Sequence, residues 1–325
     1  MTKKIYFITG GTGSFSKKFI YHLIKKKLAK KIIIFSRDEY KQMLLQELPH
    51  IKKNLSIFRF FIGDIRDKDR LDWALQDEVD VVVHSAALKQ VPTTEYNPFE
   101  TVKTNILGSQ NLIEICIKKN IKKIINISTD KAVSPINLYG STKLTAEKLF
   151  ISANLFKGKK KCIFSVIRYG NVMGSRGSVI PVFISQRKNN FFTVTDKEMT
   201  RFNITLDYAV KFVIKCLNTM KGGEIFIPKL PSYKIMDLVK AVDPNKKIKL
   251  IGIRGGEKLH EELVSGIEFP MTLEKKDSYI INPLKKDKKK SIKREAYNSY
   301  NNKDFLSVKK IKKLILENKK DFDSI

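Results

Sequence analysis

The fold is decided near the start of the chain, where residues 4–20 read KIYFITGGTGSFSKKFI. The first half, KIYFIT, predicts a buried strand, and the second half, SFSKKFI, places apolar residues at helical spacing. In the turn between them, Gly11, Gly13 and Ser16 occupy the three positions of a G-x-G-x-x-G pattern. Such a turn lets the backbone approach a pyrophosphate, and the helix N-terminus offers it free N–H groups. A glycine turn without a ligand is the alternative, but strand, turn and helix together favour a dinucleotide-binding unit.

The same alternation continues outward from this unit, as expected for βαβ units on a parallel sheet. Further strands are predicted at Lys31–Ser36, Phe58–Gly63, Val79–Ser85, Lys123–Ser128 and Cys162–Tyr169. Helices are predicted at Ser14–Lys27, Lys68–Gln76, Pro98–Lys119 and Leu138–Lys157. Beyond Asn171 the alternation weakens, through a Gly/Ser-rich loop at 174–178. A helix at Leu206–Met220 and a strand at Glu224–Pro228 are expected to return to the first domain, and a helix is expected near Ile235–Ala241.

These elements predict an α/β protein with a doubly wound parallel sheet of the Rossmann type and a smaller, interleaved C-terminal substrate domain. The nucleotide-binding domain is expected to comprise residues 1–171 and 204–228. The substrate domain is expected to comprise residues 172–203 and 229–325.

Composition limits the possible partners. With 325 residues, of which 42% are apolar, the chain can bury a large core. The net charge of +30 raises the question of a nucleic-acid partner. The lysines are scattered, however, and Asn and Ile are also frequent, as genomic base composition can produce. We therefore expect no nucleic-acid partner, although the positive field would attract a phosphate-bearing substrate. The basic run 285–293 is interpreted as a solvated loop.

Membrane and secretion signals are not apparent in the sequence. No apolar run approaches the roughly 20 residues of a membrane span, and no hydrophobic signal segment follows Met1. Cys116, Cys162 and Cys216 lie in apolar stretches without metal-like spacing, which predicts buried free thiols in a reducing compartment. A cytoplasmic location is expected, without a membrane partner or a metal.

The end of the second predicted strand, Ser36-Arg37-Asp38-Glu39, bears on the choice of cofactor. NAD enzymes place a carboxylate there for the ribose 2′-hydroxyl, whereas an arginine can pair with the 2′-phosphate of NADP. Arg37 therefore favours NADP, although Asp38 is close by. Asp64, after the third strand, fits an adenine contact or a surface turn.

Two segments carry candidate acid–base chemistry. Tyr139 and Lys143 form Y-x-x-x-K near the start of a predicted helix, so they share one helix face. An ammonium beside a phenol lowers the pKa of the phenol, and the phenolate can take a proton from a sugar hydroxyl. Thr129, at the end of a strand, can donate to the same oxygen, and Asp130 and Lys131 follow as an acid and a base or as an exposed turn salt bridge.

These motifs resemble the extended short-chain dehydrogenase/reductases, and more narrowly the inverting UDP-N-acetylglucosamine 4,6-dehydratases that begin pseudaminic acid synthesis. The resemblance covers about residues 4–283, with a weaker echo at Tyr297–Leu306. It rests on TGGTG at 9–13, SRDE at 36–39, AALKQVP at 86–92, NPFE at 97–100, KTN at 103–105, STDK at 128–131, RYGNV at 168–172, GSRGSV at 174–179, MTRF at 199–202 and GGEKLHE at 255–261. Ser16, Ser85, Asn203 and Gly255 depart from the family pattern, which usually has Gly, Ala, an aromatic residue and Pro there.

The resemblance implies a redox-neutral reaction at a UDP-sugar. C4 is oxidised, water leaves across C5 and C6, and hydride returns to C6, giving UDP-2-acetamido-2,6-dideoxy-beta-L-arabino-hex-4-ulose. The Asp130-Lys131 pair points to inversion, because retaining relatives carry Asp-Glu there. Asp130 is expected to be the acid and Lys131 the base. Lys131 must then be neutral, so a pKa lowered by burial and nearby cations is expected, with Asp130 opposing.

The resemblance and the local patterns together give three sets of site residues. The catalytic set is Thr129, Asp130, Lys131, Tyr139 and Lys143. The cofactor-binding set is Gly10, Thr12, Gly13, Ser14, Phe15, Ser36, Arg37, Asp38, Lys41, Asp64, Ile65, Ser85, Lys89, Tyr139 and Lys143. The substrate-binding set is Lys89, Lys103, Thr104, Lys131, Asn171, Thr195, Arg201, Arg254 and Glu257, in which the two arginines suit phosphate oxygens or uridine.

Other functions stay open at this point. A retaining dehydratase or a UDP-sugar 4-epimerase would use the same fold, and Lys131 and the Arg201 segment argue against both. An NADP-sensing regulator would not need intact Thr129, Tyr139 and Lys143. The resemblance also implies a homo-oligomer, a dimer or an assembly of dimers, formed through the helices predicted at Pro98–Lys119 and Leu138–Lys157.

Overall fold

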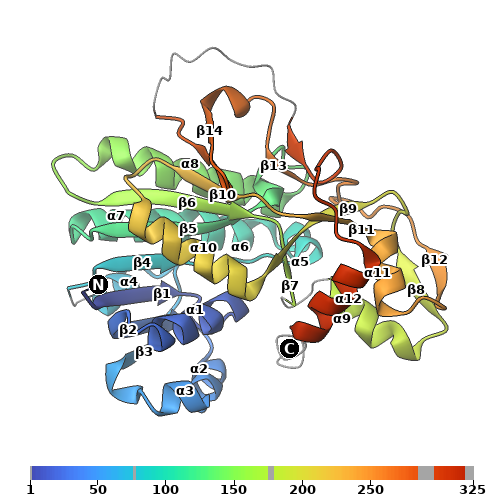
Figure 1. Ribbon diagram of the computed structural model, residues 1–325. Helices are drawn as coiled ribbons and strands as arrows, with labels where there is room; N and C mark the ends of the chain where they lie inside the picture. The colour runs from blue at the N-terminus through green and yellow to red at the C-terminus, as the bar shows by residue number, and fades with distance from the viewer. Residues whose placement is uncertain (1, 76–77, 175–178, 285–295, 319–325) are drawn as a thin grey trace.

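A nine-stranded sheet organises the molecule (Figure 1). The computed structural model describes residues 2–75, 78–174, 179–284 and 296–318. The strand order is β14-β15-β10-β6-β5-β4-β1-β2-β3, parallel from β10 to β3, with β15 and β14 antiparallel at the other edge. The strands are β1 (Lys4–Thr9), β2 (Ala29–Ser36), β3 (Phe58–Ile62), β4 (Val81–His84), β5 (Lys123–Thr129), β6 (Ile163–Tyr169), β10 (Ile225–Pro228), β14 (Thr272–Glu274) and β15 (Ser278–Ile281).

Helices cover both faces of this sheet, so its central strands are buried on both sides and consist almost entirely of apolar residues. One layer contains α1 (Ser14–Lys25) packed against α10 (Leu206–Thr219). The other contains α4 (Lys68–Ala74), α7 (Gly108–Lys118) and α8 (Leu138–Phe156). The short helices α2 (Glu39–Gln46), α3 (Pro49–Lys52), α5 (Val91–Tyr96) and α6 (Pro98–Val102) complete this part. The predicted doubly wound α/β fold is confirmed.

A smaller lobe lies beside the carboxyl ends of the sheet strands (Figure 1). It is built from strands of two small sheets, ordered β11-β9-β7 and β12-β8, and from three helices. These elements are β7 (Asn171–Met173), β8 (Phe191–Val194), β9 (Thr200–Thr205), β11 (Ser232–Lys234), β12 (Lys247–Leu250), α9 (Val179–Ser185), α11 (Ile235–Val242) and α12 (Val308–Glu317). Its core is separate from that of the large sheet and includes Phe183, Phe192, Leu238 and Ile311.

The third part of the chain connects the two cores. Strand β13 (Glu262–Val264) pairs with β16 (Tyr297–Asn298), and their buried residues pack on the larger core. β14 and β15 extend the large sheet by antiparallel pairing with β10. The structure therefore differs from the predicted boundary, which assigned all residues after 228 to the substrate domain. The hairpin satisfies backbone groups that β10 would otherwise expose at a sheet edge.

The helix predicted at Pro98–Lys119 is interrupted. Residues Lys103–Leu107 form a π-helical segment between α6 and α7. Within it, the Asn105 side chain bonds both backbone groups of Leu88 and donates to the Thr142 hydroxyl at 3.0 Å. Single π-turns often mark functional sites, and this one fixes the loop after β4 against α8.

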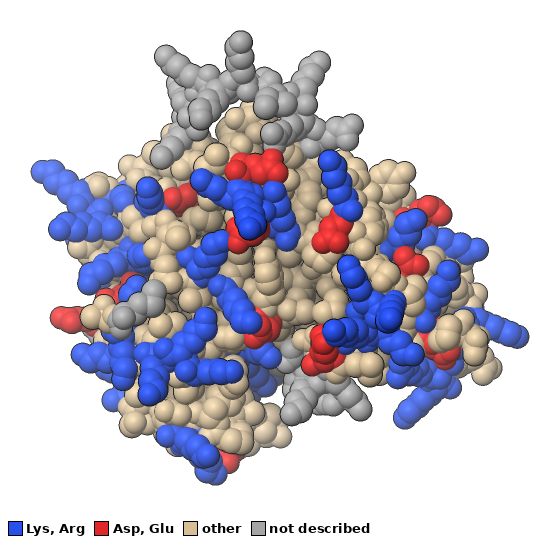
Figure 2. Space-filling model, in the orientation of Figure 1, with Lys and Arg blue, Asp and Glu red and all other residues tan. Residues whose placement is uncertain are grey.

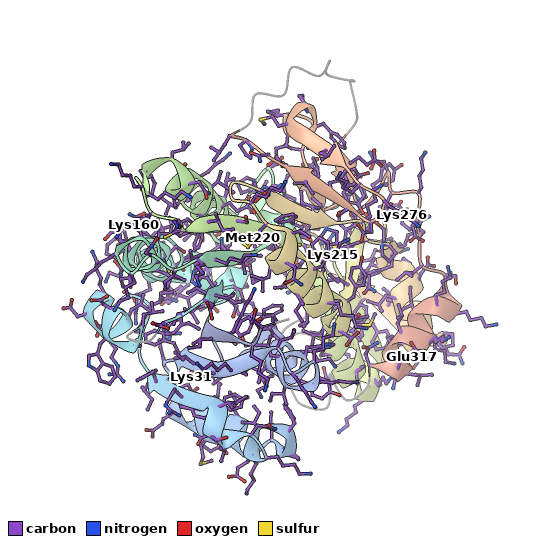
Figure 3. The ribbon with its side chains drawn as sticks, turned by 60° about the vertical axis from the view of Figure 1, so that its left-hand side comes forward. Lys31, Lys160, Lys215, Met220, Lys276 and Glu317 are labelled. Carbon is purple, nitrogen blue, oxygen red and sulfur yellow. The ribbon has the colours of Figure 1, made fainter. Side chains whose placement is uncertain are left out.

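Positive charge is spread over the surface. Figure 2 shows lysine and arginine side chains over the whole visible face, interspersed with acidic residues and not gathered in one stripe. In the turned view of Figure 3, Lys31, Lys160, Lys215 and Lys276 lie on different elements in separate parts of the molecule. The basic run at 285–293 and residues 175–178 lie outside the described residues. Among the helices described, none has the length and apolar character that a bilayer crossing requires.

Candidate active site

A cleft of about 730 Å³ opens where the carboxyl ends of β1 to β6 meet. All five predicted catalytic residues and every predicted cofactor residue line it. Of the predicted substrate residues, Lys89, Thr104, Lys131 and Asn171 line it as well. Strand ends at a switch in strand order are the usual ligand site of such sheets, and the predicted residues named above come together there.

The turn after β1 has the backbone geometry that a phosphate loop requires. Gly10 has a φ of 63°, and a Cβ there would lie 2.9 Å from the backbone of Ala86. Gly13 is the N-cap of α1, with its N–H donating to the Gly10 carbonyl at 3.0 Å, and no side chain caps the helix. The first-turn N–H groups of α1 are therefore left to a ligand, as an anion at this position would need.

Ser16 and Ser85, the two serines that depart from the family pattern beside this loop, contact each other. Ser16 is fully buried; its hydroxyl donates to the Gly10 carbonyl at 3.0 Å and lies 3.0 Å from the Ser85 hydroxyl. Ser85 in turn donates to the Thr9 carbonyl at 2.8 Å. Each of the two serines thus donates to a backbone carbonyl, and the loop keeps its shape without a third glycine.

The end of β2 presents cations to the cleft. The Asp38 carboxylate caps α2 by accepting from the Lys41 N–H at 2.9 Å, and it also pairs with the Lys41 ammonium. Arg37 is about half exposed, with Nη1 at 3.5 Å from Asp64 Oδ2. Asp38, which could bind the ribose 2′-hydroxyl of NAD, is therefore occupied by contacts within the protein. Arg37 and Lys41 place two positive charges beside it.

The candidate catalytic groups come from β5 and α8. Thr129 ends β5 and donates to Asp130 Oδ1 at 2.9 Å, and Asp130 is fully buried. Helix α8 brings Tyr139 and Lys143 to the same cleft. Between them, Gly140 lets the helix approach closely, because a Cβ there would lie 2.2 Å from the Lys131 carbonyl oxygen.

Burial governs the charge of Tyr139 and Lys143. It raises the pKa of Tyr139 to about 12, although Lys131 and Thr129 act in the other direction. It lowers the pKa of Lys143 to about 8, and the Lys143 ammonium donates to the Ile127 carbonyl at 2.8 Å. The predicted lowering of the Tyr139 pKa by Lys143 is therefore wrong in direction. The free-energy cost of removing a phenolate from water is larger here than the stabilisation that the neighbouring cation Lys131 provides.

Lys131 lies between two buried carboxylates. Its Nζ is 3.1 Å from Asp130 Oδ1 and 3.2 Å from Glu261 Oε1. Burial opposes the ammonium, but the two carboxylates raise the pKa of Lys131 above its ordinary value. The expected lowering is thus also wrong in direction, because the sequence did not reveal the second carboxylate.

The two carboxylates themselves differ. Burial raises the pKa of Asp130 against the opposing effect of Lys131. For Glu261, burial acts upward too, but the cations Lys131 and Arg201 bring the pKa below its ordinary value. Burial thereby shifts Asp130 toward its protonated form, and the two cations shift Glu261 toward its carboxylate form.

Five predicted substrate residues do not line the cleft: Lys103, Thr195, Arg201, Arg254 and Glu257. Lys103 pairs with Glu100 at 3.0 Å. The Arg201 guanidinium is buried and donates to the carbonyls of Thr200, Leu259 and Lys258, so its donors are directed inward. Arg254 is exposed. As substrate contacts these residues stay predictions.

Three polar atoms in the cleft have no hydrogen-bond partner within the described ranges. They are Thr104 Oγ1, Asp130 Oδ2 and Asn171 Oδ1, and each is buried. Buried polar atoms are rarely left unpaired in native proteins, so such atoms gathered at a cleft indicate a polar ligand. Over residues 2–75, 78–174, 179–284 and 296–318, no cluster of His, Cys, Asp and Glu suits a metal.

Sequence reasoning missed several lining residues: Gln90, Ser128, Tyr169, Gly170, Val172 and Leu206. The segment 168–172 carries part of the family resemblance, but within it the sequence predicts a role for Asn171 alone. Glu261 was missed too. It stands in the segment GGEKLHE, where Glu257 was chosen, and nothing local indicates which carboxylate reaches Lys131.

Comparison with known proteins identifies a family and relatives of two activities. A family model described as "Polysaccharide biosynthesis protein" matches residues 6–283. The inverting UDP-N-acetylglucosamine 4,6-dehydratase of Campylobacter jejuni is 51% identical over 284 residues, which cover 86% of this chain and 83% of that protein. The UDP-glucose 4-epimerase of Rickettsia bellii is 40% identical over 331 residues, covering 96% and 95%. The X-ray structure of Pen from Bacillus thuringiensis matches with a TM-score of 0.89 at 41% identity, covering 97% and 99%.

Proposed function

The chain belongs to the polysaccharide biosynthesis protein family, and from that membership we propose that it is a UDP-N-acetylglucosamine 4,6-dehydratase that inverts C5. The observation that carries the proposal is the meeting of Thr129, Asp130 and Lys131 with Tyr139 in one cleft. Oxidation alone would need only Thr129 and Tyr139. The neighbouring acid Asp130 and amine Lys131 support a further step in which the sugar loses water.

The first step is oxidation at C4. Tyr139 takes the proton of the C4 hydroxyl, and the Thr129 hydroxyl bonds the same oxygen and orients it. Tyr139 with a pKa of about 12 is a phenol at neutral pH, so a bound positive charge must favour its ionisation. A nicotinamide dinucleotide, when bound, supplies such a charge together with the hydride acceptor for C4 and donor for C6.

The second step is loss of water. The C4 ketone acidifies the C5 proton, which Lys131 removes. The C6 hydroxyl leaves as water with a proton from Asp130, whose raised pKa suits an acid. Lys131 then returns a proton to C5 from the opposite face. Its long, flexible side chain supports that reach, which a short carboxylate lacks.

We propose NADP as the cofactor. The glycine turn and the uncapped N-terminus of α1 suit the pyrophosphate. Arg37 and Lys41 at the end of β2 supply positive charge for a 2′-phosphate, while Asp38 is occupied in capping α2. Asp64 and Ile65 border the adenine end of the cleft in this proposal.

Product analysis tests the proposed function. The purified protein is incubated with UDP-N-acetylglucosamine in heavy water, and the first product is identified by NMR. We expect the 4-keto-6-deoxy sugar of L-arabino configuration with deuterium at C5. A D-configured keto sugar as first product would instead establish the retaining dehydratase.

Lys131→Ala separates the two steps. We expect it to abolish water loss but leave part of the C4 oxidation, visible as transient absorbance of the reduced cofactor. A variant that still dehydrates would remove Lys131 from its role at C5.

A second candidate is a UDP-sugar 4-epimerase, which the similarity to the Rickettsia protein favours. An epimerase would return hydride to C4 and retain the C6 hydroxyl, so Asp130 and Lys131 would have no proton to move. The same NMR experiment distinguishes it through an intact C6 hydroxymethyl group.

We also propose a homo-oligomer in the cytoplasm. Phe99, Leu107, Leu155 and Phe156 lie on α6, the π-helical segment and α8 with about half or more of their surface exposed, which suits burial in a subunit contact. Cys116, Cys162 and Cys216 are free and buried, as predicted, which suits a reducing compartment. Light scattering on the purified protein tests the assembly, and a monomer would contradict it.

A further inference from the structure

The second carboxylate at Lys131 has no role in the steps above. Glu261 directly precedes β13, and only 3% of its surface is exposed. Ser299 fixes its backbone: the Glu261 N–H donates to the Ser299 hydroxyl at 2.9 Å, and the Ser299 N–H donates to the Glu261 carbonyl at 2.8 Å. Its Oε1 lies 3.2 Å from Lys131 Nζ, while the buried Oε2 has no partner among the described residues.

This arrangement presents a chemical problem. An amine that lies 3.2 Å from the buried carboxylate of Glu261 is an ammonium and cannot accept a proton from C5. Transfer to water is unfavourable once a substrate fills the cleft and excludes solvent. The proton must therefore go to a group that already touches Nζ.

We propose that Glu261 takes the proton from Lys131 Nζ, so that the neutral amine can remove the C5 proton of the oxidised sugar. This inference rests on the proposed dehydratase function. An N–H bond of Nζ breaks as an O–H bond forms on Glu261. The C5–H bond then breaks, and its proton goes to Nζ. The electron pair forms the C5–C6 double bond while C6–O breaks, and Asp130 protonates the departing oxygen. Glu261 acts through Lys131 and is a positioning residue.

The choice of Glu261 over Asp130 follows from their surroundings. Burial shifts Asp130 toward its protonated form, and the proposed step needs its proton at the C6 oxygen, so the lysine proton goes to Glu261. Arg201 Nε lies 3.8 Å from Glu261 Oε1 and helps to keep Glu261 ionised before the transfer. A lysine–glutamate ion pair and its neutral form have the same total charge. Exclusion of water from the cleft favours the neutral form.

Several groups share this environment and contribute to any pH dependence. Facing Lys131 and Glu261 are Asp130 from the turn after β5, Tyr139 from α8, Arg201 from β9, Tyr233 from β11 and Lys258 from the loop before β13. The experiment must therefore compare variants and not rest on a single profile.

Deuterium exchange at C5 provides the test. In the wild type the proton moves internally, so the exchange rate should change little between about pH 6 and 8. In Glu261→Gln the ammonium must lose its proton to solvent. We expect exchange at neutral pH to fall on the order of 10²-fold and to rise about tenfold per pH unit, while C4 oxidation changes far less. Glu261→Asp should recover part of the rate.

Glu262→Gln is the matched control. Glu262 is the next residue, and its Oε2 accepts from the Ser134 hydroxyl at 3.0 Å and not from Lys131. It should keep the wild-type rate and profile. A Glu261→Gln variant whose C5 exchange stays within twofold of wild type, or falls with a flat pH profile, would overturn the proposal.

A second measurement requires no turnover. In protein labelled with ¹⁵N-lysine, the Lys131 ammonium signal is assigned by its loss in Lys131→Arg and titrated without substrate. Its pKa should fall in Glu261→Gln and stay unchanged in Glu262→Gln; an unchanged value in both would overturn the pairing. If the wild type only epimerised C4, the dehydratase function would fail, yet this titration would still decide whether Glu261 sets the charge of Lys131.

Discussion

Single residues in the cleft owe their charge to burial as much as to their partners. Tyr139 and Lys143 are both held toward their neutral forms by desolvation, whereas Lys131 is held as an ammonium by two carboxylates. In this structure Tyr139 is therefore a phenol and not the phenolate that takes a proton, and Lys131 is an ammonium and not the neutral amine. Substrate and cofactor binding must supply the change in environment.

Tyr139→Phe tests the oxidation step. Without the phenol, no group takes the C4 proton, so kcat should fall by roughly two to four orders of magnitude. Affinity for the UDP-sugar should stay close to wild type, as measured by calorimetry. Tyr21→Phe, at a surface position on α1, serves as the control. Near-normal turnover in the Tyr139 variant would exclude it as the base.

Arg37→Ala tests the cofactor assignment. Loss of a charge-assisted bond to the 2′-phosphate should weaken NADP binding by about 1.5–3 kcal/mol and leave NAD binding nearly unchanged. Dissociation constants for both dinucleotides give the comparison. Arg59→Ala removes the same charge from an exposed position on β3, outside the cleft. Equal weakening of NAD and NADP would contradict the role of Arg37.

His84 predicts a pH dependence of stability. Its buried ring contacts the Thr9 and Ser109 hydroxyls at 2.7 and 3.2 Å, and burial, with a smaller effect of Lys143, lowers its pKa from 6.5 to about 3. Between these values the unfolded chain binds a proton that the folded one does not. The free energy of unfolding therefore falls as pH decreases from about 6.5 toward 3, by about 2 kcal/mol at pH 5.

Urea unfolding at pH 7 and pH 5 checks this. His84→Gln should lose less stability between the two values than the wild type does, whatever its stability at pH 7. The same loss in both proteins would mean that His84 does not titrate on unfolding.

At the scale of elements, two close contacts hold the catalytic segments together. The π-helical segment lets Asn105 join the loop after β4 to α8. Gly140 lets the first turn of α8 lie against the turn that carries Asp130 and Lys131. The first contact depends on the π-helical segment, and the second depends on the missing side chain of Gly140. Together they set the position of Tyr139 relative to Lys131.

Gly140→Ala tests the second contact. Alanine favours helix by about 1 kcal/mol over glycine, but its Cβ would lie 2.2 Å from the Lys131 carbonyl oxygen. We expect a net destabilisation of about 1–3 kcal/mol and, because the catalytic groups shift, a rate loss on the order of 10²-fold. Gly266→Ala is the control, since a Cβ there meets nothing within 4 Å. An unchanged rate in Gly140→Ala would show that the contact does not position the site.

At the scale of the whole molecule, a buried ion network joins the sheet, the helical layer and the late segment. Arg168 on β6 is fully buried and bonds Glu147 of α8, with Nη2 to Oε2 at 2.5 Å. It also bonds Glu268 and the Leu263 carbonyl, each at 3.0 Å. Ser128 donates to Glu147 at 2.6 Å, so the network reaches the catalytic strand.

Arg168→Ala should therefore destabilise the protein by about 3–5 kcal/mol, because it leaves the buried Glu147 carboxylate and the partly buried Glu268 carboxylate without their cation. Thermal unfolding measures the loss. Lys118→Ala breaks an exposed pair with Asp72 and should cost no more than about 1 kcal/mol. Similar losses of stability in the two variants would show that the buried network around Arg168 contributes no more to stability than an exposed ion pair.

The sequence alone determined the order of the elements and the position of the cleft. Strand and helix periods are local properties, and the predicted strands of the first domain formed with small shifts at their ends, whereas the helix predicted at Pro98–Lys119 is interrupted by a π-helical segment. The parallel order brings residues that follow each strand to one edge, so Gly10, Arg37 and Thr129 lie in one cleft as predicted. The lysines are scattered along the sequence, and the face drawn in Figure 2 likewise shows no basic stripe.

Only the tertiary structure decided how that cleft is charged. Glu261 reaches Lys131, and Arg201 turns inward to backbone carbonyls, through packing between segments distant in sequence. The Tyr139 pKa moves opposite to the prediction because desolvation depends on everything that surrounds the ring. Local patterns fix which residues face a sheet edge. Burial and long-range contacts are properties of the whole fold, and they set the protonation states on which the chemistry depends.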